Sequence, residues 1–234
     1  MQKHAPLPDV TRRRLFGAMT ILILLLSVGV LLIGKATTRE NKGTLAREID
    51  GYRAFSTPRP DEFFSGTTTA RVVVLEYFDF ECPYCRAYHK NGEPYLLNKY
   101  KDADVAFARR YLPLTYLHPY ALVKAQLLVC AAKRNPEAYG DLVTTLYETP
   151  FEGTSTLAAV LAQISATDAA AIAQCVEEGD SFGEIANDVA KAGTSNVGIT
   201  PTFVIYKDGV ERARIEDNRL QRLDSTIELL LAEK

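Results

Sequence analysis

The arrangement of hydrophobic and polar positions divides the chain into a membrane-like segment, a polar linker and a folded region. The first hydrophobic stretch is Leu15–Gly34, LFGAMTILILLLSVGVLLIG, which carries no charge. A helix of about 20 apolar residues matches the thickness of a bilayer. Arg12, Arg13 and Arg14 precede this stretch directly. Positive charge at this end predicts that residues 1–14 stay in the cytoplasm and that the rest of the chain is exported.

The segment Leu15–Gly34 also has two other interpretations. A cleaved signal peptide usually has a shorter apolar core, of roughly 7–15 residues, and a small-residue cleavage site that Gly34-Lys35-Ala36 matches poorly. Thr11–Phe16 resembles a twin-arginine export signal, which is an address and not an anchor. The sequence leaves cleavage open, but the length of the apolar run favours a single transmembrane helix. A linker rich in charge, Gly, Thr and Pro is expected to follow over residues 35–69.

The second hydrophobic stretch, Val72–Phe80, predicts a β-strand that is covered on both faces, because nearly all its residues are β-branched, aliphatic or aromatic. It is followed by Cys82-Pro83-Tyr84-Cys85. Proline is typical of the first turn of a helix, which places Cys82 at the N-terminus of a helix predicted over Pro83–Tyr100. Unpaired N–H groups and the helix dipole favour a thiolate there. Cys85 follows one turn later, close enough to form a disulfide.

Beyond this helix, which Asn91–Pro94 is expected to kink, the pattern predicts a second strand over Val105–Leu114. A strand, a helix and a strand in this order indicate a parallel βαβ unit. Apolar positions at helical spacing then continue for about seventy residues. This is too long for a simple crossover, so an inserted helical subdomain is predicted over residues 116–195.

The last part of the chain predicts a hairpin and a closing helix. Asp208-Gly209 favours a tight turn between strands at Pro201–Tyr206 and Val210–Ile215. A final helix is expected to bury one apolar face. Its apolar positions are Leu220, Leu223, Ile227 and Leu230.

Composition narrows the possible classes of function. The chain has 234 residues and a formal net charge of −2, which argues against a nucleic-acid partner because no basic stripe is present. Residues 70–234 have the size of a single domain. The four cysteines suggest disulfides in an exported domain. No second CxxC motif and no paired histidines complete a zinc site, so neither a metal nor a cofactor is expected.

Taken together, these features resemble the DsbA-like thiol:disulfide oxidoreductases of the thioredoxin superfamily, in their membrane-anchored bacterial form. The similarity rests on the strand that leads into Cys82–Cys85 and on Glu76, where thioredoxin-like proteins carry a buried acid. It also rests on the helical insertion and on Val197–Thr202, which is similar to the cis-proline loop of the family. The resemblance implies an α/β thioredoxin-like fold with an inserted helical subdomain, preceded by one transmembrane helix.

The resemblance also implies a function and a location. The chain would exchange disulfides with cysteine-containing exported proteins, most commonly as disulfide donor, and a membrane redox partner would recharge it. It would be a monomer, held in the bacterial cytoplasmic membrane by residues 15–34, with its domain on the periplasmic side. Two alternatives stay open. One is a reductase or isomerase, for instance in cytochrome maturation, and the other is a non-catalytic thioredoxin-like binding module.

Three residues are expected to carry the chemistry. Cys82 is the predicted nucleophile and Cys85 resolves the mixed disulfide; an inert disulfide or half of a zinc site is the alternative for this pair. Burial of Glu76 is expected to raise its pKa and to let it relay protons to Cys85. The alternative for Glu76 is a carboxylate at a strand edge, paired with Lys or Arg.

Four further residues are expected to bind substrate. The family resemblance implies a cis bond between Thr200 and Pro201, which would bring the Thr200 backbone beside Cys82 to pair with an extended polypeptide. Pro83 and Tyr84 would complete this surface. Strongly oxidising members usually carry His at the position of Tyr84, so a neutral tyrosine should stabilise the thiolate less. A Cys82 pKa between roughly 3.5 and 7 is expected.

Cys130 and Cys175 lie on two different predicted helices of the insertion. In an oxidising compartment they are predicted to form a second, structural disulfide that stabilises the insertion. The alternative is two buried free thiols, which pack as small hydrophobic side chains.

Overall fold

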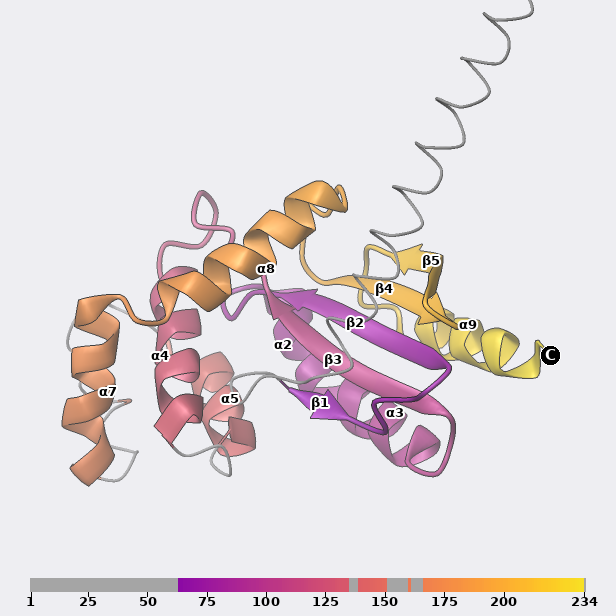
Figure 1. Cartoon of the computed structure of the whole chain (residues 1–234), viewed down its shortest axis with the longest axis horizontal. Coiled ribbons are helices and arrows are strands. Elements are labelled where there is room, and N and C mark those ends of the chain that lie inside the picture. Colours follow the sequence, from indigo (N-terminus) through magenta and orange to yellow (C-terminus); the bar gives the residue numbers. More distant parts are fainter. Residues whose placement is uncertain (1–62, 135–138, 151–159, 161–165, 234) are drawn as a thin grey trace, which may run out of the picture. The chain divides into compact units, whose positions relative to one another are not determined.

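A mixed β-sheet with the strand order β1-β3-β2-β4-β5 organises the fold (Figure 1). It is seen in a computed structural model, which describes residues 63–134, 139–150, 160 and 166–233. β2 pairs in parallel with β3 and antiparallel with β4, which confirms the predicted parallel unit. The strands are β1 (Phe64–Ser65), β2 (Val72–Phe78), β3 (Val105–Tyr111), β4 (Thr202–Lys207) and β5 (Val210–Ile215).

Helices connect β2 to β3 and fill the long segment between β3 and β4 (Figure 1). The second group confirms a helical insertion into the sheet topology, and a closing helix follows β5 as predicted. The helical elements are α2 (Pro83–Ala87), η1 (Tyr88–Gly92), α3 (Glu93–Tyr100), α4 (Ala121–Arg134), α5 (Tyr139–Glu148), α7 (Ala166–Glu178), α8 (Phe182–Thr194) and α9 (Leu220–Ala232).

β2 is buried along its whole length because helices cover both faces of the sheet. On one face, Val74 packs in a cluster with Leu96 of α3 and Ile227 of α9. On the other face, Leu75 packs in a cluster with Ala192 of α8. Burial on both sides explains why the apolar run is nearly continuous instead of alternating.

The helix predicted over Pro83–Tyr100 contains a π-helical turn at Tyr88–Gly92. There the N–H of Glu93 bonds to the carbonyl of Tyr88, five residues back. Pro94 has no N–H, and its ring crowds the carbonyl four residues earlier, so the regular bonding pattern cannot continue. The irregularity expected near Pro94 is therefore present, but it begins earlier, at Tyr88.

The second strand is shorter than predicted. β3 ends at Tyr111, three residues before the expected end at Leu114, because Pro113 cannot donate to a strand ladder. β1 lies inside the segment 35–69 that was expected to be linker, and it pairs antiparallel with β3. The sheet therefore includes an edge strand at the end of this segment, where the sequence left a short strand open as one possibility.

The helical insertion and the cysteine motif share one hydrophobic core. Leu128 of α4, Leu146 of α5 and Ile172 of α7 belong to the same buried cluster as Cys82 and Cys85. The insertion therefore contributes apolar side chains to the same core as the cysteines.

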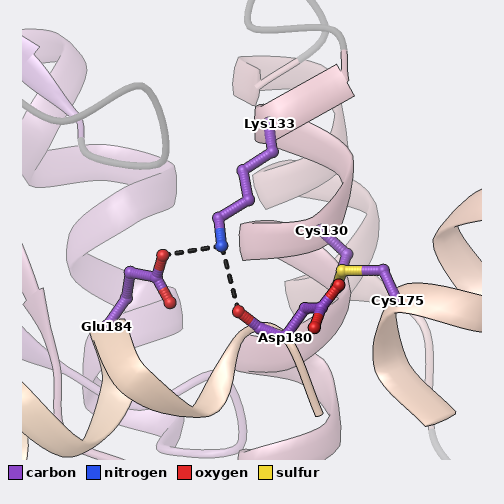
Figure 2. Close-up of a disulfide and its surroundings, with 5 residues drawn as sticks. All are labelled: Cys130, Lys133, Cys175, Asp180 and Glu184. Atoms are coloured by element: carbon purple, nitrogen blue, oxygen red, sulfur yellow. Dashed lines mark hydrogen bonds and ion pairs between the residues drawn. A yellow bond between two sulfur atoms is a disulfide. The ribbon is translucent and has the colours of Figure 1, made fainter. Parts of the chain in front are cut away.

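A disulfide joins α4 to α7 (Figure 2). The sulfur atoms of Cys130 and Cys175 lie 1.98 Å apart, and the two residues are separated by 45 positions. Near the bond, Lys133 Nζ lies 2.6 Å from Glu184 Oε1 and donates to the Asp180 carbonyl at 3.0 Å. Closing a loop of this length contributes about 4 kcal/mol in the chain-entropy model.

The predicted transmembrane helix at residues 15–34, and most of the predicted linker, lie outside the residues that the structure describes. Among the described residues, every helix is too short or too polar to cross a bilayer.

Candidate active site

Cys82 and Cys85 lie at the start of α2, directly after the loop that follows β2. Cys82 is the N-cap residue, with extended backbone angles, and Pro83 is the first residue of the helix. Both thiols are free and buried. The local sequence explains this geometry, because proline is compatible with a first helical turn and leaves the N-cap sulfur beside the exposed N–H groups of that turn.

The two thiols have opposite proton affinities. A hydrogen bond from the Cys85 thiol lowers the pKa of Cys82 to about 6, although burial opposes this, and the backbone N–H of Cys85 adds to the effect. Burial raises the pKa of Cys85 well above the ordinary value, and the hydrogen bond to Cys82 and the carboxyl of Glu76 raise it further. At neutral pH the pair therefore consists of one thiolate and one thiol.

The peptide bond between Thr200 and Pro201 is cis. The Thr200 carbonyl lies 3.2 Å from Cys82 Sγ and accepts a hydrogen bond when the thiol is protonated. Pro83 and Tyr84 are exposed on the same helix start, Tyr84 at 60%. The structure thus brings the predicted substrate-binding residues around Cys82.

Glu76 lies on β2 in the interior of the sheet and is only 4% exposed. Its Oε2 accepts a hydrogen bond from Arg109 Nε at 3.2 Å, while its Oε1 has no hydrogen-bond partner among the described residues. Burial raises the pKa of Glu76 to about 8; Arg109 opposes this shift and Glu93 adds to it. The alternative of an edge carboxylate is therefore wrong about the location, although Glu76 is paired with an arginine.

Sequence reasoning missed the partners of Glu76. Arg109 is opposite Glu76 in the parallel register of β2 and β3, and its Nη2 also donates to Glu93 Oε1. His89 Nδ1 lies 2.8 Å from the other oxygen of Glu93. A signal was present, since Glu76 and Arg109 are each the fifth residue of their strand and each interrupts an apolar run.

Asp79 holds the loop that precedes Cys82, a role that the sequence did not suggest. Its Oδ1 accepts the backbone N–H of Glu81 at 2.7 Å. Its Oδ2 accepts the backbone N–H of Leu114 and lies 2.8 Å from His118 Nδ1. This buried carboxylate therefore connects the cysteine loop to the chain that follows β3.

A small cleft of about 260 Å³ opens beside Cys82. It has mixed polarity, and Lys124 inside it donates to the Thr149 carbonyl at 3.2 Å. Burial lowers the pKa of Lys124. The cleft gives a substrate side chain space next to the nucleophile. Its lining residues are Phe80, Glu81, Cys82, Arg86, Lys124, Tyr147, Thr149 and Pro150.

We expect the Cys82 thiol of the reduced protein to titrate with a midpoint near pH 6, measured by the ultraviolet absorbance of the thiolate or by its alkylation rate. The thiolate stabilises the reduced fold fully above the ordinary cysteine pKa of about 8.5, because the folded pKa is the lower one. That stability is lost as the pH falls through about 6. A midpoint at about pH 8 or above, as in an ordinary thiol, would contradict this.

The chain resembles known proteins in sequence and in structure. Residues 59–228 match the model of a family described as Thioredoxin. BdbD from Bacillus subtilis, in its oxidised form, superposes with a TM-score of 0.62 at 18% identity, over 74% of this chain and 94% of that chain. DsbA2 from Pseudomonas aeruginosa superposes with a TM-score of 0.56 at 23% identity, over 73% of this chain and 96% of that chain.

The curated relatives are much longer than this chain, which matches only a part of each. The Na(+)/H(+) antiporter NhaA 3 of Salinispora tropica is 33% identical over 141 residues, which is 60% of this chain and 21% of the antiporter. The chain thus spans about a fifth of the length of the curated relatives it matches. In the part of the chain that the structure describes, no group of His, Cys, Asp and Glu is arranged to hold a metal ion.

Proposed function

Because the chain belongs to the thioredoxin family, we propose that it is a thiol:disulfide oxidoreductase that exchanges disulfides with proteins through Cys82 and Cys85. The observation that carries the proposal is the asymmetry of the pair: a thiolate-forming Cys82 at a helix N-terminus, and a buried Cys85 that keeps its proton. A structural disulfide or a metal site does not require two thiols of different pKa, whereas thiol–disulfide exchange depends on this difference.

The exchange proceeds in two steps. A substrate thiolate attacks the Cys82 sulfur of the oxidised site, and the bond to Cys85 breaks so that Cys85 leaves as a thiolate. Glu76, which holds a proton near neutral pH, gives it to the Cys85 sulfur. The second substrate thiolate then attacks the substrate sulfur of the mixed disulfide, which releases oxidised substrate and the Cys82 thiolate.

We further propose that disulfide donation is the favoured direction. A stabilised Cys82 thiolate favours the reduced site, which makes the disulfide a stronger oxidant. Substrates would dock as extended chains against the Thr200 backbone, beside the exposed Pro83 and Tyr84. The recipients would be cysteine-containing exported proteins.

The location and the recharging partner belong to the same proposal. The uncharged stretch of residues 15–34 supports a single-pass anchor in the cytoplasmic membrane, with the domain outside the cytoplasm. The Cys130–Cys175 disulfide supports an oxidising compartment. A membrane redox partner would then restore the Cys82–Cys85 disulfide.

The test is oxidative refolding of a reduced, unfolded protein that needs one disulfide. We expect catalytic amounts of the oxidised chain to accelerate refolding above the rate with glutathione alone. A chain with Cys82 and Cys85 blocked by alkylation is the control, and equal rates for the two would overturn the proposal. The reduction potential decides the direction, since a value near about −120 mV indicates donation and one near about −270 mV indicates reduction.

A further inference from the structure

The buried guanidinium of Arg109 donates hydrogen bonds to two carboxyl groups at once. Its Nε donates to Glu76 and its Nη2 donates to Glu93. The three side chains are 3%, 5% and 8% exposed, in the order Arg109, Glu76 and Glu93. One positive charge therefore faces two carboxylates where water screens little, and two like charges at one site push one pKa upward.

Of the two carboxylates, Glu93 has the surroundings that stabilise its negative charge better. Its second oxygen lies 2.8 Å from His89 Nδ1. Although burial opposes ionisation, Arg109 and His89 lower the pKa of Glu93. The shared negative charge therefore resides on Glu93.

Glu76 has the opposite environment. Its Oε1 is buried and has no hydrogen-bond partner among the described residues, and its Oε2 shares Arg109 with Glu93. A carboxyl group that is incompletely hydrogen-bonded and faces a second carboxylate retains its proton. At neutral pH the proton of this network therefore resides on Glu76.

The other titratable groups around Glu76 do not change this assignment. Burial raises the pKa of both nearby tyrosines, so their hydroxyls stay neutral. Cys82 ionises near pH 6, and its thiolate raises the pKa of Glu76 further, whereas Cys85 keeps its proton. The groups acting on Glu76 are Arg109 of β3, Glu93 of α3, Cys82 and Cys85 of α2, Tyr88 of η1 and Tyr147 of α5.

We infer that Glu93 is a positioning residue for Glu76: by binding one side of the Arg109 guanidinium, it keeps Glu76 able to carry a proton and pass it to Cys85. The inference rests on the proposed function, in which Cys85 leaves as a thiolate when substrate attacks Cys82. The proton then moves from the Glu76 carboxyl to the Cys85 sulfur. It returns to Glu76 when Cys85 attacks during recharging, so protons balance over the cycle.

The variant Glu93→Gln, in the full chain, tests this directly. It removes a negative charge near Glu76 and leaves the guanidinium to Glu76, so both effects lower the proton affinity of Glu76. By NMR of ¹³C-labelled glutamate, assigned with Glu76→Gln, we expect the Glu76 midpoint to fall from about 8 in the parent by about one unit or more, a tenfold change in the ratio of its two forms. The alkaline limb of the pH–rate profile for substrate oxidation should shift by the same amount.

The matched control is Glu184→Gln, which also removes a carboxylate from an ion pair, with Lys133 near the Cys130–Cys175 disulfide (Figure 2). We expect it to leave the Glu76 titration unchanged. If Glu93→Gln does not fold, Glu93→Asp is measured instead. Its shorter side chain holds the Arg109 guanidinium less firmly and leaves more of it to Glu76, so the Glu76 midpoint should shift in the same direction by a smaller amount.

The outcomes separate the inference from the proposed function. An unchanged Glu76 midpoint in a folded variant, with an active parent, would overturn the inference and leave Glu93 as an anchor between α3 and β3. A parent without disulfide exchange would overturn the proposed function, and the proton transfer to Cys85 with it. A shifted midpoint together with a shifted pH–rate profile supports both.

Discussion

Replacing Cys82 by serine will lower disulfide transfer to the uncatalysed rate, because a hydroxyl neither forms the mixed disulfide nor ionises near neutral pH. Cys85→Ser will behave differently. It cannot form the Cys82–Cys85 disulfide, but its Cys82 thiolate still attacks disulfides in substrates, and these mixed disulfides accumulate because no Cys85 thiol resolves them. Non-reducing gels with mass spectrometry of the trapped species measure both effects and identify the substrates.

The matched control for these variants is the double substitution Cys130→Ser and Cys175→Ser, which removes the other pair of cysteines. It should keep disulfide transfer at temperatures where the chain stays folded, because that pair lies between α4 and α7. If Cys82→Ser retained the parental rate, the cysteine motif would be structural, and a binding module would explain the fold better.

Replacing Arg109 by methionine will destabilise the fold by about 3–5 kcal/mol at neutral pH, because removing one partner of a buried ion pair leaves its charge uncompensated. Here the Glu93 carboxylate loses its cation, and the protonated Glu76 loses a hydrogen-bond donor. The loss should shrink at acidic pH, where protonated carboxyls need no counter-charge. The measurement is the free energy of unfolding from denaturant titrations of parent and variant at two pH values.

Arg71→Met provides the same substitution in an exposed setting. Arg71 pairs with Asp208 at 2.9 Å, with the two side chains 47% and 54% exposed. Exposed ion pairs contribute about 0–1 kcal/mol, so this variant should unfold close to the parent. Equal losses for Arg71→Met and Arg109→Met would show that burial of the Arg109 network adds nothing to stability.

The family, the fold and the position of the cysteine motif could be predicted because their signals are local. A continuous apolar run, a CxxC motif with proline and an acid inside a strand each stand in a few consecutive residues. Membership of the thioredoxin family is confirmed by the family model, and the expected fold is confirmed by the superpositions on DsbA2 and BdbD. The expected donor role, membrane anchor and partners stay predictions.

The hydrogen-bond network of Glu76, Arg109 and Glu93 could not be predicted, because it depends on the register in which β2 and β3 pair. Glu76 meets Arg109 only when β2 and β3 are aligned in parallel from Val72 and Val105. Glu93 joins them from α3, directly after a π-helical turn that the sequence pattern does not reveal. A single residue of slip would move Arg109 to the other face of the sheet, and the two charged positions inside apolar runs suggest a pairing without fixing the register.

Because the cysteines and the helical insertion share one hydrophobic core, the insertion is not an exchangeable module. A chimera that carried the α4–α8 region of another family member would replace the apolar wall against which the Cys82–Cys85 pair packs. It would therefore be expected to acquire a new reduction potential even with an unaltered CxxC motif. Grafting experiments on this chain should transplant the motif and its helical cover together.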